Sequence, residues 1–364
     1  MNLPFVDGFI NVVLLLAILV VLVLIHEFGH FIVARRADVK VHEFGIGFPP
    51  RAGILKRGKE TLYTLNWLPI GGFVRLEGED GVSDDPRSFV RKPLGTRLII
   101  LLAGVGMNLL LAWVLMSAIA YIDDPSVRVR VDALPASADG APSPAAQARL
   151  VVGDTIVAID QQTFAWFDSP TAPLDYLKAH PEATVTLTVV RADGTTADLQ
   201  ATLRDAEAIA AGEGALGVGA RTYIAGGSIA HGIVESLVIG AKRTIQACGL
   251  ILVAVRDLVT DITNPQVSGP IGIVSAVGTV RGSPPIFLLY LVAILSANLA
   301  VVNALPLPPM DGGRIAISLV KAVSGNRISA AAERWTYAVG FMLLMAFLVY
   351  ISIFDIARLG GAAP

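Results

Sequence analysis

Three residues near the start of the chain, His26, Glu27 and His30, form the pattern His-Glu-x-x-His within an apolar run. The two histidines are four positions apart, so a helix places both rings on one face, where they can share a zinc ion. The glutamate between them can serve as general base toward a water molecule that zinc activates. Ionisable side chains are costly in hydrocarbon, so such a cluster in an apolar run indicates function. The pattern predicts hydrolytic chemistry inside a membrane, with one Zn²⁺ per chain.

Asp311 is the predicted third zinc ligand, because zinc in hydrolases usually takes three protein ligands. It lies in the segment NALPLPPMDGG (Asn303–Gly313), whose prolines interrupt an apolar run. Irregular backbone at membrane depth is tolerated where it is buried in protein or lines a water-filled cavity. Taken alone, the segment also fits an ordinary cytoplasmic turn. The single cysteine, Cys248, excludes an internal disulfide and a cysteine-based zinc site.

The composition predicts a polytopic α-helical membrane protein, since 54% of the 364 residues are hydrophobic and only 16% are charged. A net charge of −2 gives no attraction to nucleic acid, and no such partner is expected. The apolar stretch within residues 229–258 is too short to cross a bilayer, so this segment is predicted to be an amphipathic, membrane-associated helix. Four runs are long enough to be transmembrane helices: residues 9–33, 98–122, 285–305 and 335–356.

Basic residues set the predicted orientation, because loops rich in lysine and arginine face the cytoplasm. They concentrate in the loops 35–97 and 306–334. Both termini and the segment between the second and third spans are then extracytoplasmic. His26 follows Val12 by roughly 21 Å of helix at 1.5 Å per residue. In a hydrocarbon core about 30 Å thick, the site therefore lies nearer the cytoplasmic face, at a depth that Asp311 can share.

The cytoplasmic loop 35–97 carries strand signals on either side of a Pro-Ile-Gly-Gly turn, in the segment Glu60–Asp80. It is predicted to form a membrane-associated β-hairpin element. A protease needs an extended substrate, and an exposed sheet edge can hold one by strand addition. Trp67, Gly71 and Gly72 are the predicted substrate-binding residues of this loop. A hairpin that only packs on the spans for stability is the alternative.

The extracytoplasmic segment 127–223 is less apolar and has the length of one domain. Strand signals at 127–131 and 155–160, a helix at 174–179 and a hairpin over 184–203 follow one another. With the pattern LxxGDxIxxID, this order resembles a single PDZ domain of the circularly permuted bacterial kind. The resemblance implies an α+β fold with a peptide groove. Specific peptide capture, gating and simple docking over the site are left open.

Three motifs together resemble the bacterial site-2 protease family, the intramembrane zinc metalloproteases of the regulator-of-sigma-E protease type. They are HEFGH in the first span, SGPIGI (Ser268–Ile273) before the third and NALPLPPMDGG after it. The resemblance implies zinc ligation by His26, His30 and Asp311, with Glu27 as catalytic acid/base. It also implies substrate contacts by Asn303 and Pro306, and a membrane-embedded β element that favours the substrate role of the loop. The second span reads AGVGMN (Ala103–Asn108), with Val105 where the family usually has a proline that kinks the helix.

The predicted function is cleavage of single-pass membrane proteins in or near their transmembrane segments, in the inner membrane of a bacterium. Anti-sigma factors and signal-peptide remnants both fit, and a peptide ligand for the PDZ domain is a further partner class beside the lipid bilayer. Two alternatives remain: a membrane-anchored zinc peptidase acting on cytosolic substrates, and a non-proteolytic adaptor carrying a PDZ domain. A metal transporter would need more polar residues in the other spans.

Overall fold

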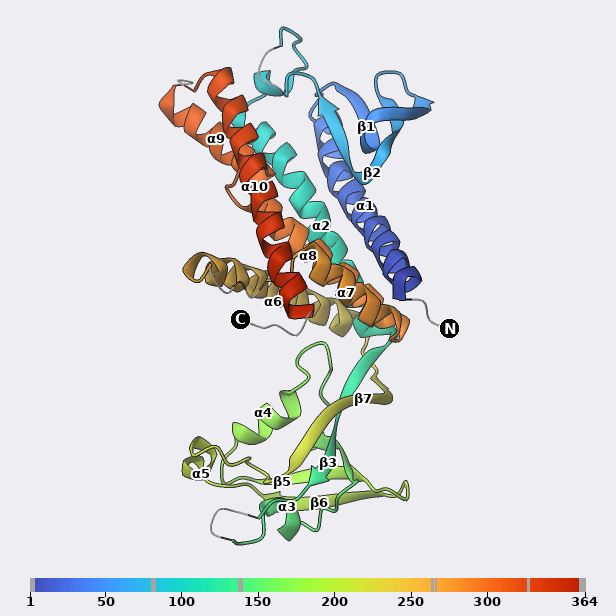
Figure 1. The fold of residues 1–364 in the computed structure, drawn as a ribbon, viewed down its shortest axis with the longest axis vertical. Coiled ribbons are helices and arrows are strands. Elements are labelled where there is room, and N and C mark those ends of the chain that lie inside the picture. Colours follow the sequence, from blue (N-terminus) through green and yellow to red (C-terminus); the bar gives the residue numbers. More distant parts are fainter. Residues whose placement is uncertain are drawn as a thin grey trace. The chain divides into compact units, whose positions relative to one another are not determined.

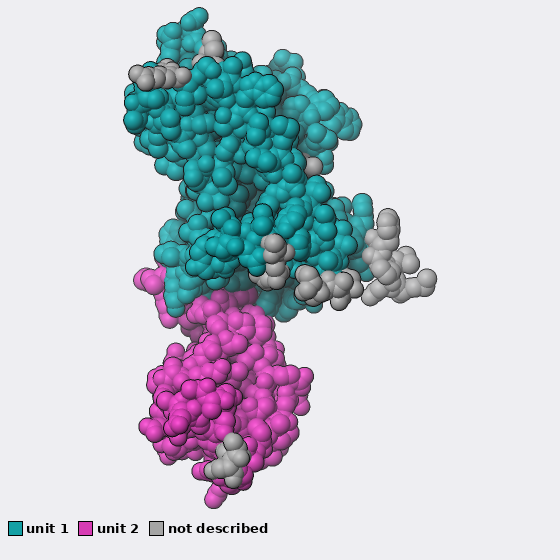
Figure 2. Space-filling model, turned by 60° about the vertical axis from the view of Figure 1, so that its left-hand side comes forward, with its two compact units in different colours: residues 1–116, 240–364 teal, residues 117–239 magenta. Residues whose placement is uncertain are grey.

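The chain forms two compact units, residues 1–116 with 240–364 and residues 117–239 (Figure 2). The computed structural model describes residues 4–79, 83–136, 140–262, 265, 267–325 and 328–359. The predicted location of both termini outside the cytoplasm concerns chain ends that lie outside the described residues. Each unit has its own core, and the predicted site residues all belong to the first unit.

Long apolar helices make up most of the first unit (Figure 1). Little of the apolar stretch is buried in the protein, only 11% in α1 and 17% in α10, so most of this surface needs a nonaqueous neighbour. The chain is therefore a helical membrane protein with a sheet region. The helices are α1 (Pro4–Arg36), the 3₁₀ turn η1 (Phe89–Arg91), α2 (Leu94–Ile122), α6 (Ile233–Thr260), α7 (Pro270–Arg281), α8 (Pro285–Ala304), α9 (Asp311–Ser324) and α10 (Ala330–Leu359).

Five helices of the described residues are long and apolar enough to cross a membrane, where the sequence predicts four. The predicted spans lie within α1, α2, α8 and α10. The fifth, α6, continues through the charged residues that bracket its apolar centre. Figure 1 shows it running across the direction of α1 and α10. The count of four spans and the placement of α6 along the membrane stay predictions. Helix α2 passes through Val105 without a break.

The loop between α1 and α2 folds as a sheet of two long antiparallel strands, β1 (Val41–Arg57) and β2 (Leu62–Leu76). Both strands bend, so that residues 43–46 of β1 pair with residues 62–65 on one side and residues 72–75 on the other. Residues 62–65 pair again with residues 53–57. Within the described strands, residues 72–75 have a partner on one side only and therefore form a free edge.

The second unit is a five-stranded antiparallel sheet in the order β6-β5-β4-β3-β7 with short helices. Alternating apolar side chains of β3, β4 and β5 form its core with Leu150 and Leu177. Strand β7 extends beyond the predicted end of the domain at residue 223. The elements are β3 (Asp124–Ala133), α3 (Pro144–Gln147), β4 (Thr155–Ile159), α4 (Ala172–Lys178), β5 (Thr184–Val190), β6 (Thr196–Thr202), α5 (Ala206–Ala210) and β7 (Gly219–Ile229).

A tight turn joins α8 to α9 and sets the position of Asp311. Helix α8 ends before the prolines, which cannot continue its hydrogen bonding. A Cβ on Gly312 would lie 2.2 Å from the carbonyl oxygen of Leu305, so the turn packs directly on the first turn of α9. The segment 306–334 is thus not only a loop: α9 occupies 14 of its residues, and Asp311 is the first residue of that helix.

Candidate active site

Helix α1 places His26 and His30 one turn apart with their rings in contact. Their Nε2 atoms lie 3.1 Å apart and the ring centroids 4.8 Å apart. Both side chains are buried inside the protein, although most of α1 faces outward. Two buried imidazoles in an apolar helix require polar partners, because unpaired polar groups are costly there.

Asp311 completes a cluster with these rings, as the sequence predicts. Its Oδ2 lies 2.9 Å from Nε2 of His26 and 3.2 Å from Nε2 of His30. One ligand atom from each residue lies within 4.8 Å of the others. An acidic residue at the first position of a helix is also favoured by the helix dipole. Residues 285 positions apart in the chain therefore converge on one point.

Helix α2 holds the far side of both rings. Nδ1 of His30 donates to the carbonyl oxygen of Ile100 at 2.8 Å, which leaves its Nε2 as the atom with a free lone pair. Nδ1 of His26 lies 3.3 Å from the side-chain amide of Asn108. Between these two contacts stands Gly104, where an added Cβ would lie 2.5 Å from Nε2 of His30 and 2.6 Å from Nε2 of His26.

The donor set fits zinc. Two imidazole nitrogens with one carboxylate oxygen form a ligand set of catalytic zinc sites, which keep a further position open. The second nitrogen of each ring has its own partner, as metal-binding histidines require. The missing side chain of Gly104 leaves room beside both Nε2 atoms. The residues present can thus hold a zinc ion.

The cluster opens into a cavity of about 560 Å³, which Glu27 also lines. Apolar residues of α1 and α2 form part of its wall, and the free edge of the sheet forms another part through Gly72, Phe73 and Val74. A half-buried carboxylate, the metal-binding cluster and an unpaired strand edge therefore share one enclosure.

The predicted substrate-binding residues divide into two groups. Asn303, Gly71 and Gly72 line the cavity, whereas Pro306 and Trp67 are absent from its described lining. Trp67 is 70% exposed. Gly72 also has a packing role, because a Cβ there would lie 2.9 Å from the carbonyl oxygen of Gly45 and 3.0 Å from Leu24 of α1. These roles in substrate binding stay predictions.

Arg314 and Glu79, which both line the cavity, form an ion pair that was not predicted from the sequence. The guanidinium also lies over the ring of Tyr337, 5.9 Å from its centroid. Arg314 follows Asp311 by three positions, so both face the same side of α9. This spacing of three positions is the sequence signal from which Arg314 could have been placed near the site. The pair ties α9 to the end of the sheet.

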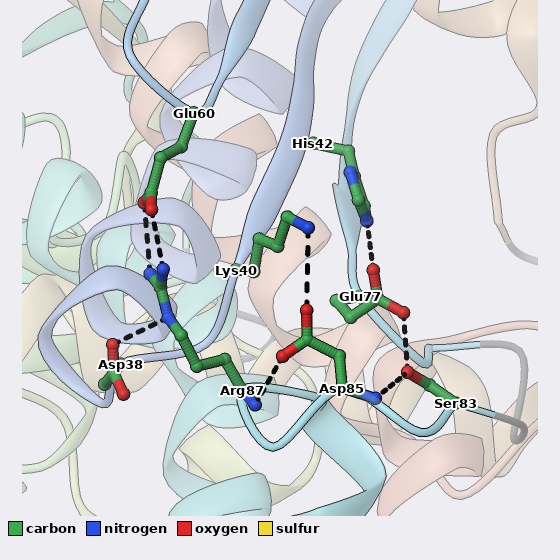
Figure 3. Close-up of polar contacts among 8 residues, drawn as sticks. All are labelled: Asp38, Lys40, His42, Glu60, Glu77, Ser83, Asp85 and Arg87. Atoms are coloured by element: carbon green, nitrogen blue, oxygen red, sulfur yellow. Dashed lines mark hydrogen bonds and ion pairs between the residues drawn. The ribbon is translucent and has the colours of Figure 1, made fainter.

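A polar network lies beside this same end of the sheet (Figure 3). Glu77 accepts hydrogen bonds from Ser83 at 2.6 Å and pairs with His42 at 2.5 Å. These contacts hold the pKa of the Glu77 carboxyl below its ordinary value, the Ser83 hydroxyl having the largest effect. The backbone N–H of Arg87 lowers the pKa of Asp85 in the same way. The loop that leads into α2 is thereby attached to β1 and β2.

In the second unit, a groove of about 190 Å³ lies between α4 and residues 214–220. Leu174, Leu177, Leu216 and Val218 give it an apolar floor, and Lys178 stands at its side. The sequence analysis predicts a peptide groove in this domain without locating it.

Comparison with known proteins identifies relatives along almost the whole chain. The sequence profile of peptidase family M50 matches residues 14–347. A protein of Clostridium acetobutylicum, named as an inferred zinc metalloprotease, is 32% identical, with 96% of this chain and 98% of that protein aligned. The zinc metalloprotease RasP of Bacillus licheniformis is 27% identical, with 93% and 96% aligned. The regulator of sigma-W protease RasP of Bacillus subtilis is also 27% identical, with 96% and 99% aligned.

Proposed function

Because this chain belongs to peptidase family M50 and is a zinc metalloprotease, we propose that it cleaves single-pass membrane proteins in or near their transmembrane helix. The predictions of a zinc metalloprotease and of a zinc cofactor are confirmed by these relatives. The proposed substrate class is more specific than what the names of these relatives state. It is supported by the two buried histidines of the metal-binding cluster, which lie on α1, a helix that is long and apolar enough to cross a bilayer.

His26, His30 and Asp311 hold the zinc ion in this proposal. When bound, zinc supplies Lewis acidity toward a carbonyl oxygen and a water molecule. Glu27 lines the cavity one residue from His26, and it takes a proton from the attacking water and returns it to the leaving amine. The single observation that carries the assignment is that two buried histidines and a half-buried aspartate from distant segments meet at one cavity.

The free strand edge at residues 72–75 gives the site a way to hold an extended substrate. A helix hides its peptide bonds in its own hydrogen bonds, so a transmembrane segment must unwind before cleavage. Adding it as a further strand satisfies the backbone groups that unwinding exposes. Asn303 lines the same cavity and is a further substrate contact. The edge and the metal ligands border one enclosure, so strand addition would present a peptide bond beside the cluster.

The orientation we propose places the protein in the bacterial inner membrane with the site near the cytoplasmic face. The basic loops 35–97 and 306–334 are then cytoplasmic, and the second unit is extracytoplasmic. Anti-sigma factors and signal-peptide remnants are the proposed substrates. The name of the Bacillus subtilis relative, regulator of sigma-W protease, supports a substrate that controls a sigma factor.

The second unit acts as a PDZ domain in this proposal. Its groove is bordered by a helix on one side and by the segment entering β7 on the other, an arrangement in which a peptide can add to a strand. The apolar floor would take an apolar side chain of a peptide. The groove either selects substrates or serves only for docking. In both cases a peptide bound there takes no part in the zinc-dependent cleavage.

A Glu27→Gln variant tests the proposed mechanism in the full-length protein. We expect it to bind zinc, because Glu27 is outside the ligand cluster, and to leave a single-pass substrate uncut in proteoliposomes. Glu207→Gln changes an exposed glutamate of the second unit and serves as the matched control. Cleavage by Glu27→Gln at the wild-type rate would refute the role of Glu27.

The substrate preference separates the alternatives. An intramembrane protease cuts the membrane-inserted substrate and spares a soluble peptide of the same sequence around the scissile bond. Preference for the soluble peptide would favour a zinc peptidase of cytosolic substrates. Binding without cleavage by the wild-type, zinc-loaded protein would favour an adaptor.

A further inference from the structure

We propose that Asn108 is a positioning residue of the metal site, which holds the His26 ring with its Nε2 directed at the metal. This inference rests on the zinc site proposed above. Asn108 is completely buried in α2, and its amide lies 3.3 Å from Nδ1 of His26. A polar side chain fully buried in an apolar helix needs a reason to be there. The contact with His26 supplies that reason.

The chemistry of a neutral imidazole fixes what Asn108 must do. One ring nitrogen carries a proton and the other a lone pair, and only the lone pair can bind a metal. Nε2 of His26 lies 2.9 Å from the Asp311 carboxylate and 3.1 Å from Nε2 of His30, so Nε2 is the metal-side atom. Nδ1 must then carry the proton, and the atom facing it must be an acceptor.

The carboxamide of Asn108 can supply that acceptor. Its Oδ1 is buried and has no hydrogen-bond partner in the part of the chain that the structure describes. A half-turn about the Cβ–Cγ bond exchanges Oδ1 with Nδ2 and brings the oxygen opposite Nδ1 of His26. Either orientation leaves one amide atom without a described partner, so bound zinc decides between them. With zinc present, Nδ1–H of His26 donates to Oδ1.

His30 shows the same arrangement with a different acceptor. Its Nδ1 donates to the backbone carbonyl of Ile100, an acceptor that no substitution removes. His26 has no backbone acceptor at the equivalent place among its described contacts, and it relies on a side chain. Both ring partners come from α2, two helical turns apart, with Gly104 midway between them. One face of α2 therefore orients both histidines.

Helix α8 holds Asn108 in place from behind. The hydroxyl of Ser296, which is fully buried, donates to the backbone carbonyl oxygen of Asn108 at 2.8 Å. The backbone of α2 is thus tied to α8 at the residue whose side chain meets His26. Because the backbone is held in place, the Asn108 carboxamide can adjust to His26 only by rotating about its own side-chain bonds.

Two substitutions of Asn108 separate positioning from packing. Asn108→Leu keeps the size and removes the acceptor, whereas Asn108→Asp keeps an acceptor and adds a charge. Loss of a ring partner of this kind typically lowers metal affinity about 10- to 100-fold. We expect that loss for Asn108→Leu and near wild-type zinc affinity for Asn108→Asp. A purely structural role gives the opposite order, because a buried charge in an apolar helix is worse than leucine.

The measurement is zinc affinity of the purified full-length protein in detergent, by competition with a chromogenic chelator. The visible spectrum of the cobalt-loaded protein reports the ligand geometry independently of affinity and activity. Thr244→Val removes another buried side-chain hydrogen bond of the first unit and controls for a general loss of stability.

Three outcomes decide the matter. Weaker zinc binding with an altered cobalt spectrum in Asn108→Leu, and recovery in Asn108→Asp, supports the proposal. Wild-type affinity in Asn108→Leu, or an equal loss in both variants, overturns it. His26→Ala is measured in parallel: if it leaves zinc affinity unchanged, the metal site itself fails, and if it abolishes binding while Asn108→Leu does not, only the role of Asn108 fails.

Discussion

Replacing Gly104 with alanine is the sharpest test of the site that the structure allows. The added methyl would lie 2.5 Å from Nε2 of His30 and 2.6 Å from Nε2 of His26. A zinc ion bound to these nitrogens lies about 2.0–2.1 Å from each. The methyl therefore competes directly for the space beside both ligand atoms.

The size of the effect follows from these distances. The methyl is closer to the imidazole nitrogens than the 3.4 Å of an ordinary contact by almost 1 Å. The rings or α2 must move by about that amount, and a displacement of ~1 Å at a reacting centre can cost about 10²-fold in rate. The same substitution favours the helix itself by about 1 kcal/mol, since glycine is a poor helix former. We expect loss of zinc and of activity without unfolding.

Gly106→Ala is the matched control in the same helix. Nothing lies within 4 Å of the Cβ that it would add. It brings the same gain in helix propensity as Gly104→Ala, and it leaves the rings untouched. Zinc content by mass spectrometry, proteolysis of a membrane-inserted substrate and thermal unfolding in detergent are measured for both variants.

The reasoning is refuted if Gly104→Ala retains a full equivalent of zinc and cleaves at the wild-type rate. That result would place the functional metal elsewhere than beside the two Nε2 atoms. Equal losses in Gly104→Ala and Gly106→Ala would mean that stiffening α2, and not the ligand clash, is responsible.

Two further predictions concern the scaffold. Asp355→Leu removes the buried carboxylate that accepts hydrogen bonds from the backbone N–H groups of Gly269 and Gly272. The melting temperature should fall by an amount corresponding to ~1–3 kcal/mol per unpaired group. Ser352→Ala, on the same helix, is the control and should change the melting temperature little. Because the folded pKa of Glu77 lies below its ordinary value, this carboxylate stabilises the fold above pH 4.5, and the contribution is lost as the pH falls from there through the folded pKa. Glu77→Gln should therefore weaken the acid dependence of thermal unfolding below pH 4.5, and an unchanged profile would contradict the prediction.

The residues of the candidate site were predictable because local rules decide their positions. The spacing of His26 and His30 follows from the helical repeat, and prolines end an apolar helix wherever they occur. Asp311 could therefore be paired with the histidines from its depth together with the need of a catalytic zinc for a third protein ligand. The hairpin and sheet of the second unit followed from alternation, which also depends only on neighbouring residues.

The supporting residues could not be predicted because they depend on how helices pack. Tertiary packing decides which face of α2 turns toward α1. The sequence singles out the segment AGVGMN (Ala103–Asn108), to which Gly104 and Asn108 belong, but not the contacts of these two residues with the histidines. The extent of α6 (Ile233–Thr260) is close to the predicted helix 229–258, but its apolar stretch was judged too short to cross a bilayer, whereas the whole helix is long and apolar enough. Lysine and arginine can extend along a helix with their charged ends in a polar region, so charged residues at the edge of an apolar stretch do not end the helix.

The metal site and the crossing of α1 and α2 are the same feature of this molecule. A Cβ on Gly29, the fourth residue of HEFGH, would lie 2.4 Å from the carbonyl oxygen of Ala103. A Cβ on Gly104, the next residue of α2, would meet both histidine rings. Small residues let membrane helices approach closely, and here that approach brings the backbone of α2 within reach of the rings. The glycine of HEFGH therefore contributes to the metal site through packing, because only a close crossing allows Ile100 and Asn108 to orient His30 and His26.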